Sequence, residues 1–147
     1  STGMTAFMRR IQGFKDTICK WKPNVHLIGP YDFQQDRDLV FKITKNLLIS
    51  TPVDGIYVSN IYVEDVANAV ESLGLSRQVK IIGHDLSTGI RKKLEDGTIN
   101  ATICQEPELQ GRLAVQLLAN YLVFAEKPQQ EYFFTKLEII ISENLPK

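Results

Sequence analysis

The sequence predicts an α/β protein whose mainly parallel sheet carries helices on both faces. Along its 147 residues, amphipathic segments alternate with short apolar runs, and the unit helix–strand occurs five times. Helix-length connections favour parallel pairing, because a crossover must return the chain to the same end of the sheet. Several strand-like runs also end on polar side chains, which is typical of the edge where parallel sheets bind ligands.

The first predicted helix begins near Thr5, a residue type that caps helices through its side-chain oxygen. Apolar side chains follow at spacings of three and four, as in a helix with one buried face. Pro23 ends this helix, and residues 25–28 are predicted to form a short buried strand. A loop with two aromatic side chains, Tyr31 and Phe33, leads to the next helix.

The middle of the chain predicts two further helices separated by a strand. The first is expected over 36–49 and ends before Pro52. A strand over 55–60 finishes on polar residues. The helix over 63–73 carries a stripe of Val, Ala and Leu side chains on one face, and Gly74 follows it as a C-terminal glycine.

Two strands with a helix between them form the stretch where the sequence predicts a site. The strands cover 79–83 and 101–105, and the helix covers 88–95. The first strand opens into Asp85, and the second ends on Gln105. Either residue alone is most simply an ordinary loop residue. Two of them at equivalent strand ends favour a binding site, because loops present side chains there without disturbing the core.

The last predicted elements are a helix over 110–124 with a broad apolar face and a strand over 133–141. Lys127-Pro128 lies between them and ends the helix. The strand carries apolar side chains on both of its sides. Exposed apolar faces and unpaired strand edges invite pairing with another chain, so a homo-oligomer is predicted.

Composition and motifs exclude several functions. Seventeen basic and seventeen acidic residues cancel, so no global field attracts nucleic acid or an anionic membrane. No apolar run approaches the ~20 residues of a membrane-spanning helix. Metal-ligand spacing, glycine-rich phosphate loops and nucleophile motifs are all missing from the sequence. We therefore expect a binding module that is not an enzyme and holds no metal or cofactor.

The two cysteines, Cys19 and Cys104, lie in different apolar segments and have no CxxC spacing. This favours buried, reduced thiols, with a disulfide between them as the open alternative.

Five segments resemble, in order and spacing, the ligand-sensing domain of LacI-family transcription regulators: MRRIQGF, GIYVSN, KIIGHD, INATICQEPELQG and LEIIISENL. The same module underlies periplasmic sugar-binding proteins of the ribose-binding type. The resemblance implies one lobe of a two-lobed, type I periplasmic-binding-protein-like fold, with a small molecule, usually a sugar, between the lobes. Residues 1–147 then correspond to the carboxyl-terminal lobe together with a crossover helix over 107–126.

The resemblance also implies the ligand-binding residues. Arg10 corresponds to an arginine whose planar donors fork onto sugar hydroxyls or a carboxylate. Polar side chains at three strand ends correspond to residues that hydrogen-bond hydroxyls: Asn60, Asp85 and Gln105. Phe33 corresponds to an aromatic that covers the apolar face of a sugar ring, with Tyr31 as the alternative. We expect the four polar residues to lie along one edge of the sheet.

Two functions from different classes remain. The main interpretation is the effector-binding part of a cytoplasmic bacterial regulator, which contacts operator DNA only through an amino-terminal domain absent from this sequence. The SENL ending and the crossover spacing resemble the regulators more closely. The alternative is an exported periplasmic sugar-binding protein of a transport or chemoreception system, and an enzyme ranks third.

Overall fold

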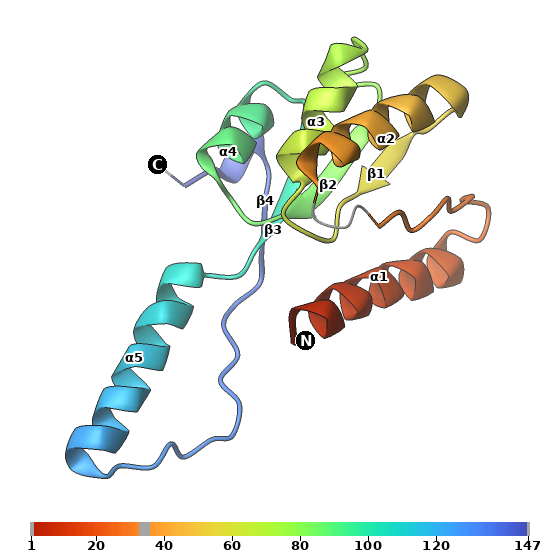
Figure 1. The fold of residues 1–147 in the computed structure, drawn as a ribbon. Helices are drawn as coiled ribbons and strands as arrows, with labels where there is room; N and C mark the ends of the chain where they lie inside the picture. The colour runs from red at the N-terminus through yellow and green to blue at the C-terminus, as the bar shows by residue number, and fades with distance from the viewer. Residues whose placement is uncertain (1, 33–35, 147) are drawn as a thin grey trace.

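The computed structural model describes residues 2–32 and 36–146, with the side chains of residues 2–5 left out. The described elements are, in chain order, α1 (Thr2–Trp21), α2 (Arg37–Ser50), β1 (Gly55–Tyr57), α3 (Val63–Ser72), β2 (Lys80–His84), α4 (Thr88–Glu95), β3 (Ala101–Cys104), α5 (Pro107–Phe124), β4 (Glu138–Ile140) and the 3₁₀ turn η1 (Ser142–Asn144). Figure 1 shows a layered α/β unit from which α5 and its returning segment project.

The sheet has the strand order β1-β2-β3-β4, and its first three strands are parallel. β4 runs antiparallel to β3, with Thr102 opposite Ile140. The chain leaves the sheet at the carboxyl end of β3, runs outward along α5 and returns to that same end, so β4 runs antiparallel to β3 (Figure 1). The α/β class and the mainly parallel sheet are therefore confirmed.

One face of the sheet carries the hydrophobic core. Ile81 of β2 is fully buried, and α2, α3 and α4 supply the side chains that cover it. These side chains include Val40, Val63 and Leu94. The packing is tight where β2 meets α3, because a Cβ atom added at Gly83 would collide with both methyl groups of Val63. This glycine lets the strand and the helix approach closely.

The opposite face of the sheet is largely open. Register places Tyr57 beside Ile82 on this face, and Ile103 beside Ile139. Ile82 is 41% exposed and Ile139 is 64% exposed. Helix α1 contacts this side through Phe14, whose ring stacks on Tyr57 at a centroid distance of 4.6 Å. Helices therefore contact both faces, although α1 leaves much of the second face uncovered.

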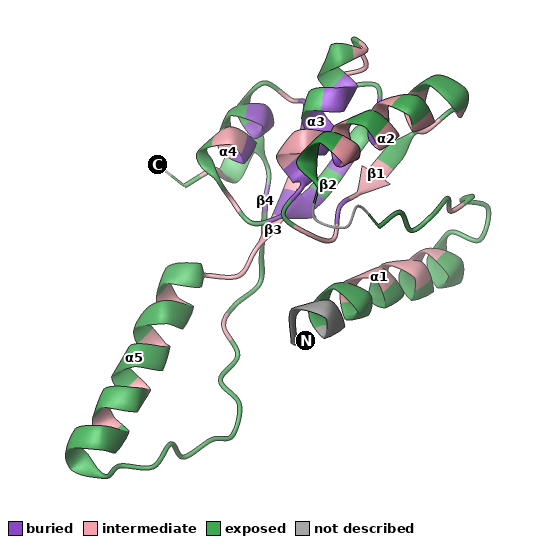
Figure 2. Cartoon of the chain, in the orientation of Figure 1, coloured by how far each residue is buried: buried purple, intermediate pink, exposed green. Residues whose placement is uncertain are grey.

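Helix α5 packs against no core. None of its residues is buried, and most of the segment that returns from it is exposed as well (Figure 2). Large apolar side chains on these two segments are more than half exposed: Val115, Leu118, Leu122, Val123, Phe124, Tyr132, Phe134 and Leu137. The broad apolar face predicted for this helix is thus present, and among the described residues the core of the sheet does not cover it.

Two predicted strands differ from the structure. Residues 25–28 form an irregular segment in which Val25 and Ile28 are 49% and 42% exposed. A short apolar run becomes a strand only where a neighbouring strand offers hydrogen bonds, and among the described residues β1 pairs with β2 alone. The predicted strand over 133–141 shrinks to β4, because its partner β3 ends at Cys104, opposite Glu138.

Smaller differences concern single residues. Thr5 lies within α1, which begins at Thr2, rather than capping it. Both cysteines are free thiols, as favoured by their spacing, but Cys19 is exposed and Cys104 only partly buried. The expectation that both are buried is therefore wrong. Within the described residues, no helix combines the length and apolar character needed to cross a bilayer.

Candidate functional site

Three predicted site residues lie at one edge of the sheet, because they follow strands that run in parallel. Asn60, Asp85 and Gln105 come after β1, β2 and β3 respectively. We call this edge, made by residues 59–60, 85 and 105, the carboxyl edge. Parallel sheets present ligand-binding side chains at this position.

The backbone of Asp85 is fixed while its carboxylate stays exposed. Its N–H donates to the carbonyl of Ile103 at 3.0 Å, and its carbonyl accepts from the hydroxyl of buried Thr102 at 2.6 Å. Its φ of 68° lies in the left-handed region, which Asp tolerates better than most residues. Gln105 Nε2 lies 3.4 Å from Asp85 Oδ1. The strand end therefore presents the carboxylate to solvent as a hydrogen-bond acceptor on a fixed backbone.

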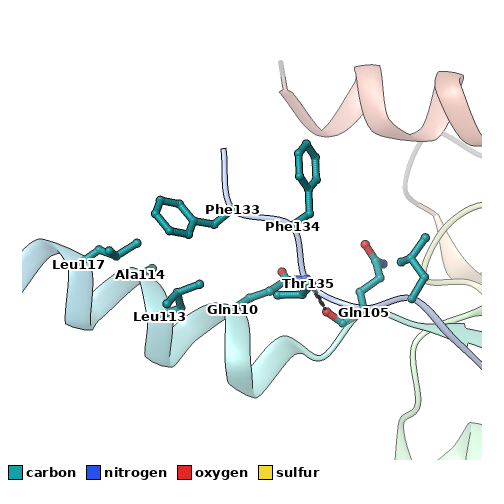
Figure 3. A pocket seen from close by; sticks show the side chains of 9 residues that line it. Gln105, Gln110, Leu113, Ala114, Leu117, Phe133, Phe134 and Thr135 are labelled. Carbon is teal, nitrogen blue, oxygen red and sulfur yellow. Dashed lines mark hydrogen bonds between the residues drawn. The ribbon is translucent and has the colours of Figure 1, made fainter. Parts of the chain in front are cut away.

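Gln105 marks the junction between β3 and α5. Its carbonyl accepts from Gln110 Nε2 at 2.5 Å and from the Thr135 hydroxyl at 2.9 Å. Figure 3 shows these contacts at one end of a groove of about 660 Å³ between α5 and the returning segment. The groove walls are mainly apolar side chains: Leu113, Ala114, Leu117, Phe133, Phe134 and Leu137. This groove suits an apolar surface better than a polar ligand, so the carboxyl edge remains the candidate site.

The side chain of Asn60 stabilises the turn that follows β1. Its Oδ1 accepts from the backbone N–H of Tyr62 at 3.1 Å, which closes the turn into α3. The amide N–H₂ group remains as a donor without a hydrogen bond among the described residues.

Arg10 reaches the carboxyl edge from α1. One guanidinium nitrogen donates to the carbonyl of Ser59 at 2.9 Å, so the side chain lies at the end of β1. Its other donors have no hydrogen bond among the described residues. Phe33 lies outside the described residues, and its alternative Tyr31 is 46% exposed in an irregular segment.

The pair Tyr57–His84 was not singled out from the sequence. Tyr57 Oη and His84 Nε2 form a 2.9 Å hydrogen bond, and His84 is only 5% exposed. His84 Nδ1 is buried without a partner among the described atoms. An unpaired lone pair costs less to bury than an unpaired N–H, which favours the tautomer with its proton on Nε2. Alternation along the strand predicts that Tyr57 lies on the face opposite Ile56. Its position beside His84 depends on the register between β1 and β2, which the sequence does not show.

His84 and Asp85 also line a hollow of about 230 Å³ at the starts of α2, α3 and α4. The remaining lining residues come from these helices and their preceding loops: Arg37, Ile61, Glu64, Ser87 and Ile90. In the part of the chain that the structure describes, no group of three or more His, Cys, Asp or Glu side chains is arranged to hold a metal ion.

Burial controls the protonation of this pair. It lowers the pKa of His84 from 6.5 to about 4, with help from the nearby Arg10 charge and against the opposing effect of Asp85. Burial also raises the pKa of Tyr57 above its usual 10.0, although Arg10 acts in the other direction. At neutral pH both side chains are therefore uncharged, and Arg10 and Asp85 carry the charges of the carboxyl edge.

The lowered pKa of His84 makes stability depend on pH. Between pH 6.5 and about 4 the unfolded chain binds a proton at this residue that the folded chain does not. The free energy of unfolding is therefore expected to fall as the pH is lowered through this window, by at most about 3.4 kcal/mol. In His84→Phe this component disappears. Urea denaturation of both proteins at about pH 7 and about pH 4.5 measures the difference. Equal pH dependence in the two proteins would contradict the assignment.

Comparison with known proteins identifies the class to which this fold belongs. Residues 1–127 match the family model described as periplasmic binding protein domain. The chain therefore belongs to the periplasmic binding protein family.

Named relatives are sugar-binding proteins. A ribose import binding protein of Haemophilus influenzae is 34% identical over 127 residues, which is 85% of this chain and 42% of the relative. Its Salmonella typhimurium counterpart is 29% identical over 135 residues, covering 88% of this chain and 43% of the relative. The chain thus spans less than half the length of these curated relatives.

Solved structures of sugar-binding proteins are also similar to this chain. A glucose-galactose binding protein from Geobacillus stearothermophilus matches with a TM-score of 0.81 and 26% identity, over 94% of this chain and 49% of that one. A carbohydrate transporter solute binding protein from Agrobacterium radiobacter, in complex with D-arabinose, has a TM-score of 0.85. It is 22% identical over 93% of this chain and 46% of that one, so it supports the fold alone.

These relatives correct one prediction and weaken another. The cytoplasmic location is wrong, because the chain belongs to the periplasmic binding protein family and its relatives are import binding proteins. The regulator interpretation receives no support from these relatives, which favour the alternative of a transport-associated sugar-binding protein.

Proposed function

We propose that this chain is a sugar-binding lobe of a periplasmic solute-binding protein that serves import. The observation that carries the proposal is the convergence of Asn60, Asp85 and Gln105 on one edge, with Arg10 held beside them by its bond to Ser59. Relatives that bear the names of ribose and glucose-galactose binding proteins support a monosaccharide as the ligand.

The chemistry of the carboxyl edge suits a neutral polyol. The Asp85 carboxylate only accepts hydrogen bonds, and charged acceptors bind hydroxyl donors more strongly than neutral ones. Arg10 supplies donors in a planar fork, and the amides of Asn60 and Gln105 both donate and accept. Adjacent hydroxyls of a sugar, each a donor and an acceptor, match this mixture. None of these roles includes a bond-breaking step, so the proposed function is binding without catalysis.

We propose ribose, or a monosaccharide of similar size, as the ligand and an ABC-type transporter as the partner. Ribose follows from the curated relatives, and the transporter follows from the name of a related solute binding protein from Agrobacterium vitis. Calorimetric titration of the full-length gene product with D-ribose, D-arabinose, D-glucose and D-galactose tests this. Saturable binding of at least one sugar with a Kd well below about 1 mM is expected. No saturable binding to any of the four overturns the proposal.

The same framework explains the uncovered surfaces. We propose that residues 1–147 form the carboxyl-terminal lobe and that α5, the predicted crossover helix over 107–126, packs against a second lobe in the complete protein. In support, α5 has no buried residue, and the groove between it and Phe133 is apolar. Such apolar surfaces are normally covered by another unit.

The isolated chain is therefore expected to self-associate. With no second lobe present, the exposed side chains of α5 and the returning segment bury apolar area only against another copy. Sedimentation velocity over a hundredfold range of concentration (roughly 5 to 500 μM) measures this. Replacing exposed Leu118 and Leu122 by serine should shift the equilibrium toward monomer. A strictly monomeric chain at the highest concentration would contradict this expectation, because the apolar surface would then remain exposed to solvent.

A further inference from the structure

Helix α1 is attached to the sheet through few contacts. None of its described side chains is fully buried. Two contacts of its described side chains anchor it: the bond from Arg10 to the carbonyl of Ser59, at 2.9 Å, and the stack of Phe14 on Tyr57. The two rings of this stack are almost parallel, with an interplanar angle of 13°. The position of Arg10 therefore depends on the orientation of the Tyr57 ring.

His84 holds the Tyr57 ring in place. The two rings meet edge to face at a centroid distance of 5.8 Å, and the 2.9 Å hydrogen bond joins Tyr57 Oη to His84 Nε2. Because His84 Nδ1 has no partner among the described atoms, this is the hydrogen bond that orients the imidazole. His84 also directly precedes Asp85 in the chain. A continuous set of contacts thus runs from Asp85 through His84 and Tyr57 to α1.

We propose that Tyr57 and His84 are positioning residues of the sugar site, which hold α1 so that Arg10 and Asp85 face the same ligand. This inference rests on the proposed function, and it assigns to these two side chains no contact with the sugar. The tyrosine hydroxyl orients the ring on which Phe14 stacks, and the stack places the turn of α1 that carries Arg10.

The charges around His84 give this arrangement a distinctive pH dependence. Titratable or charged side chains face His84 from each packed element that carries one: Arg10 from α1, Tyr57 from β1, Asp85 after β2, Glu64 from α3 and Arg37 from α2. The pKa of His84 is held at about 4 by burial and by Arg10. Protonation places a second cation near Arg10, so affinity for the sugar is expected to fall as the pH approaches 4.

Tyr57→Phe in the full-length product is the direct test. It keeps the aromatic stack and removes only the hydroxyl, so the fold is retained. We expect the affinity for the best-bound monosaccharide to fall by about three- to tenfold, in keeping with the loss of one hydrogen bond. The imidazolium form of His84 also loses the acceptor for its Nε2 proton while the ring stays buried, so the acid midpoint of binding should move below its wild-type value. Hydrogen exchange of the α1 amides should accelerate relative to that of α3.

Tyr121→Phe is the matched control, because Tyr121 lies on α5 and is 48% exposed. It should leave the affinity, the acid midpoint and the exchange of α1 unchanged. His84→Phe is a second variant, which should accelerate the exchange of α1 and abolish the acid transition of binding.

The outcomes separate the two proposals. If the wild-type protein binds a sugar and Tyr57→Phe binds it with equal affinity and an equal acid midpoint, the positioning inference is overturned and the proposed function stands. If the wild-type protein binds no sugar, the proposed function fails and the positioning inference fails with it. Unchanged exchange of α1 in both variants overturns the inference whatever the protein binds.

Discussion

Asp85→Asn is expected to weaken monosaccharide binding by the full-length protein by about tenfold to a hundredfold. Hydrogen bonds to a charged group contribute about 1.5–3 kcal/mol, and each 1.4 kcal/mol corresponds to a factor of ten in Kd. Asparagine is chosen over alanine because residue 85 has a φ of 68°, a conformation that asparagine adopts at little cost. The substitution thus removes the charge without straining the strand end. Calorimetric titration measures the effect.

Asp54→Asn provides the matched control at the opposite end of the sheet. Asp54 directly precedes β1, is exposed and forms no side-chain hydrogen bond or ion pair among the described residues. It should leave the Kd unchanged, and both variants should unfold at the temperature of the wild-type protein. Equal losses of affinity in the two variants would show that the effect comes from net charge rather than from the carboxyl edge.

Gly83→Ala is expected to lower the free energy of unfolding by about 1–3 kcal/mol, the usual cost of overpacking a core. The new methyl group would collide with the side chain of Val63, which is fully buried and faces β2 from α3. Urea denaturation measures the loss. Gly13→Ala is the control, because a Cβ atom added at Gly13 would meet no atom within 4 Å and alanine favours a helix by up to about 1 kcal/mol.

Val63→Ala should rescue Gly83→Ala. By itself it loses two buried methyl groups, at a cost of roughly 2 kcal/mol. In the double variant the new methyl group at 83 occupies the space vacated at 63. The double variant should therefore be more stable than the sum of the single effects predicts, by about 1 kcal/mol or more. Strict additivity would mean that the two positions do not compete for the same space.

The local elements were predictable where local signals specify them. Helix α4 has the predicted bounds, because Ser87 caps its first turn and Asp96-Gly97 ends it. The strand predicted over residues 25–28 is absent because a strand requires a partner. Nothing in the segment itself shows whether a partner is present. The same reason shortened the strand predicted over 133–141 to the three residues that face β3.

The site was predictable to the extent that topology determines it. Once three strands are parallel, Asn60, Asp85 and Gln105 must share an edge, whatever their side chains do. The hydrogen bond between Tyr57 and His84 has a different origin. It depends on the register that sets Tyr57 beside Ile82, and register is a property of the assembled sheet. The cellular location could likewise not be predicted from individual residues, and the resemblance to regulators led to the wrong prediction of a cytoplasmic protein.

Chemical-shift mapping tests the central claim, that the carboxyl edge holds the sugar. The full-length protein would be titrated with its best-bound monosaccharide while backbone amide resonances are followed by NMR. The account predicts the largest shifts at Asn60, Asp85 and Gln105, with little change at the opposite edge around Asp54 and Gln78. Saturable binding accompanied by shifts that spare the carboxyl edge and cluster at the opposite edge, or along the apolar groove beside α5, would contradict it.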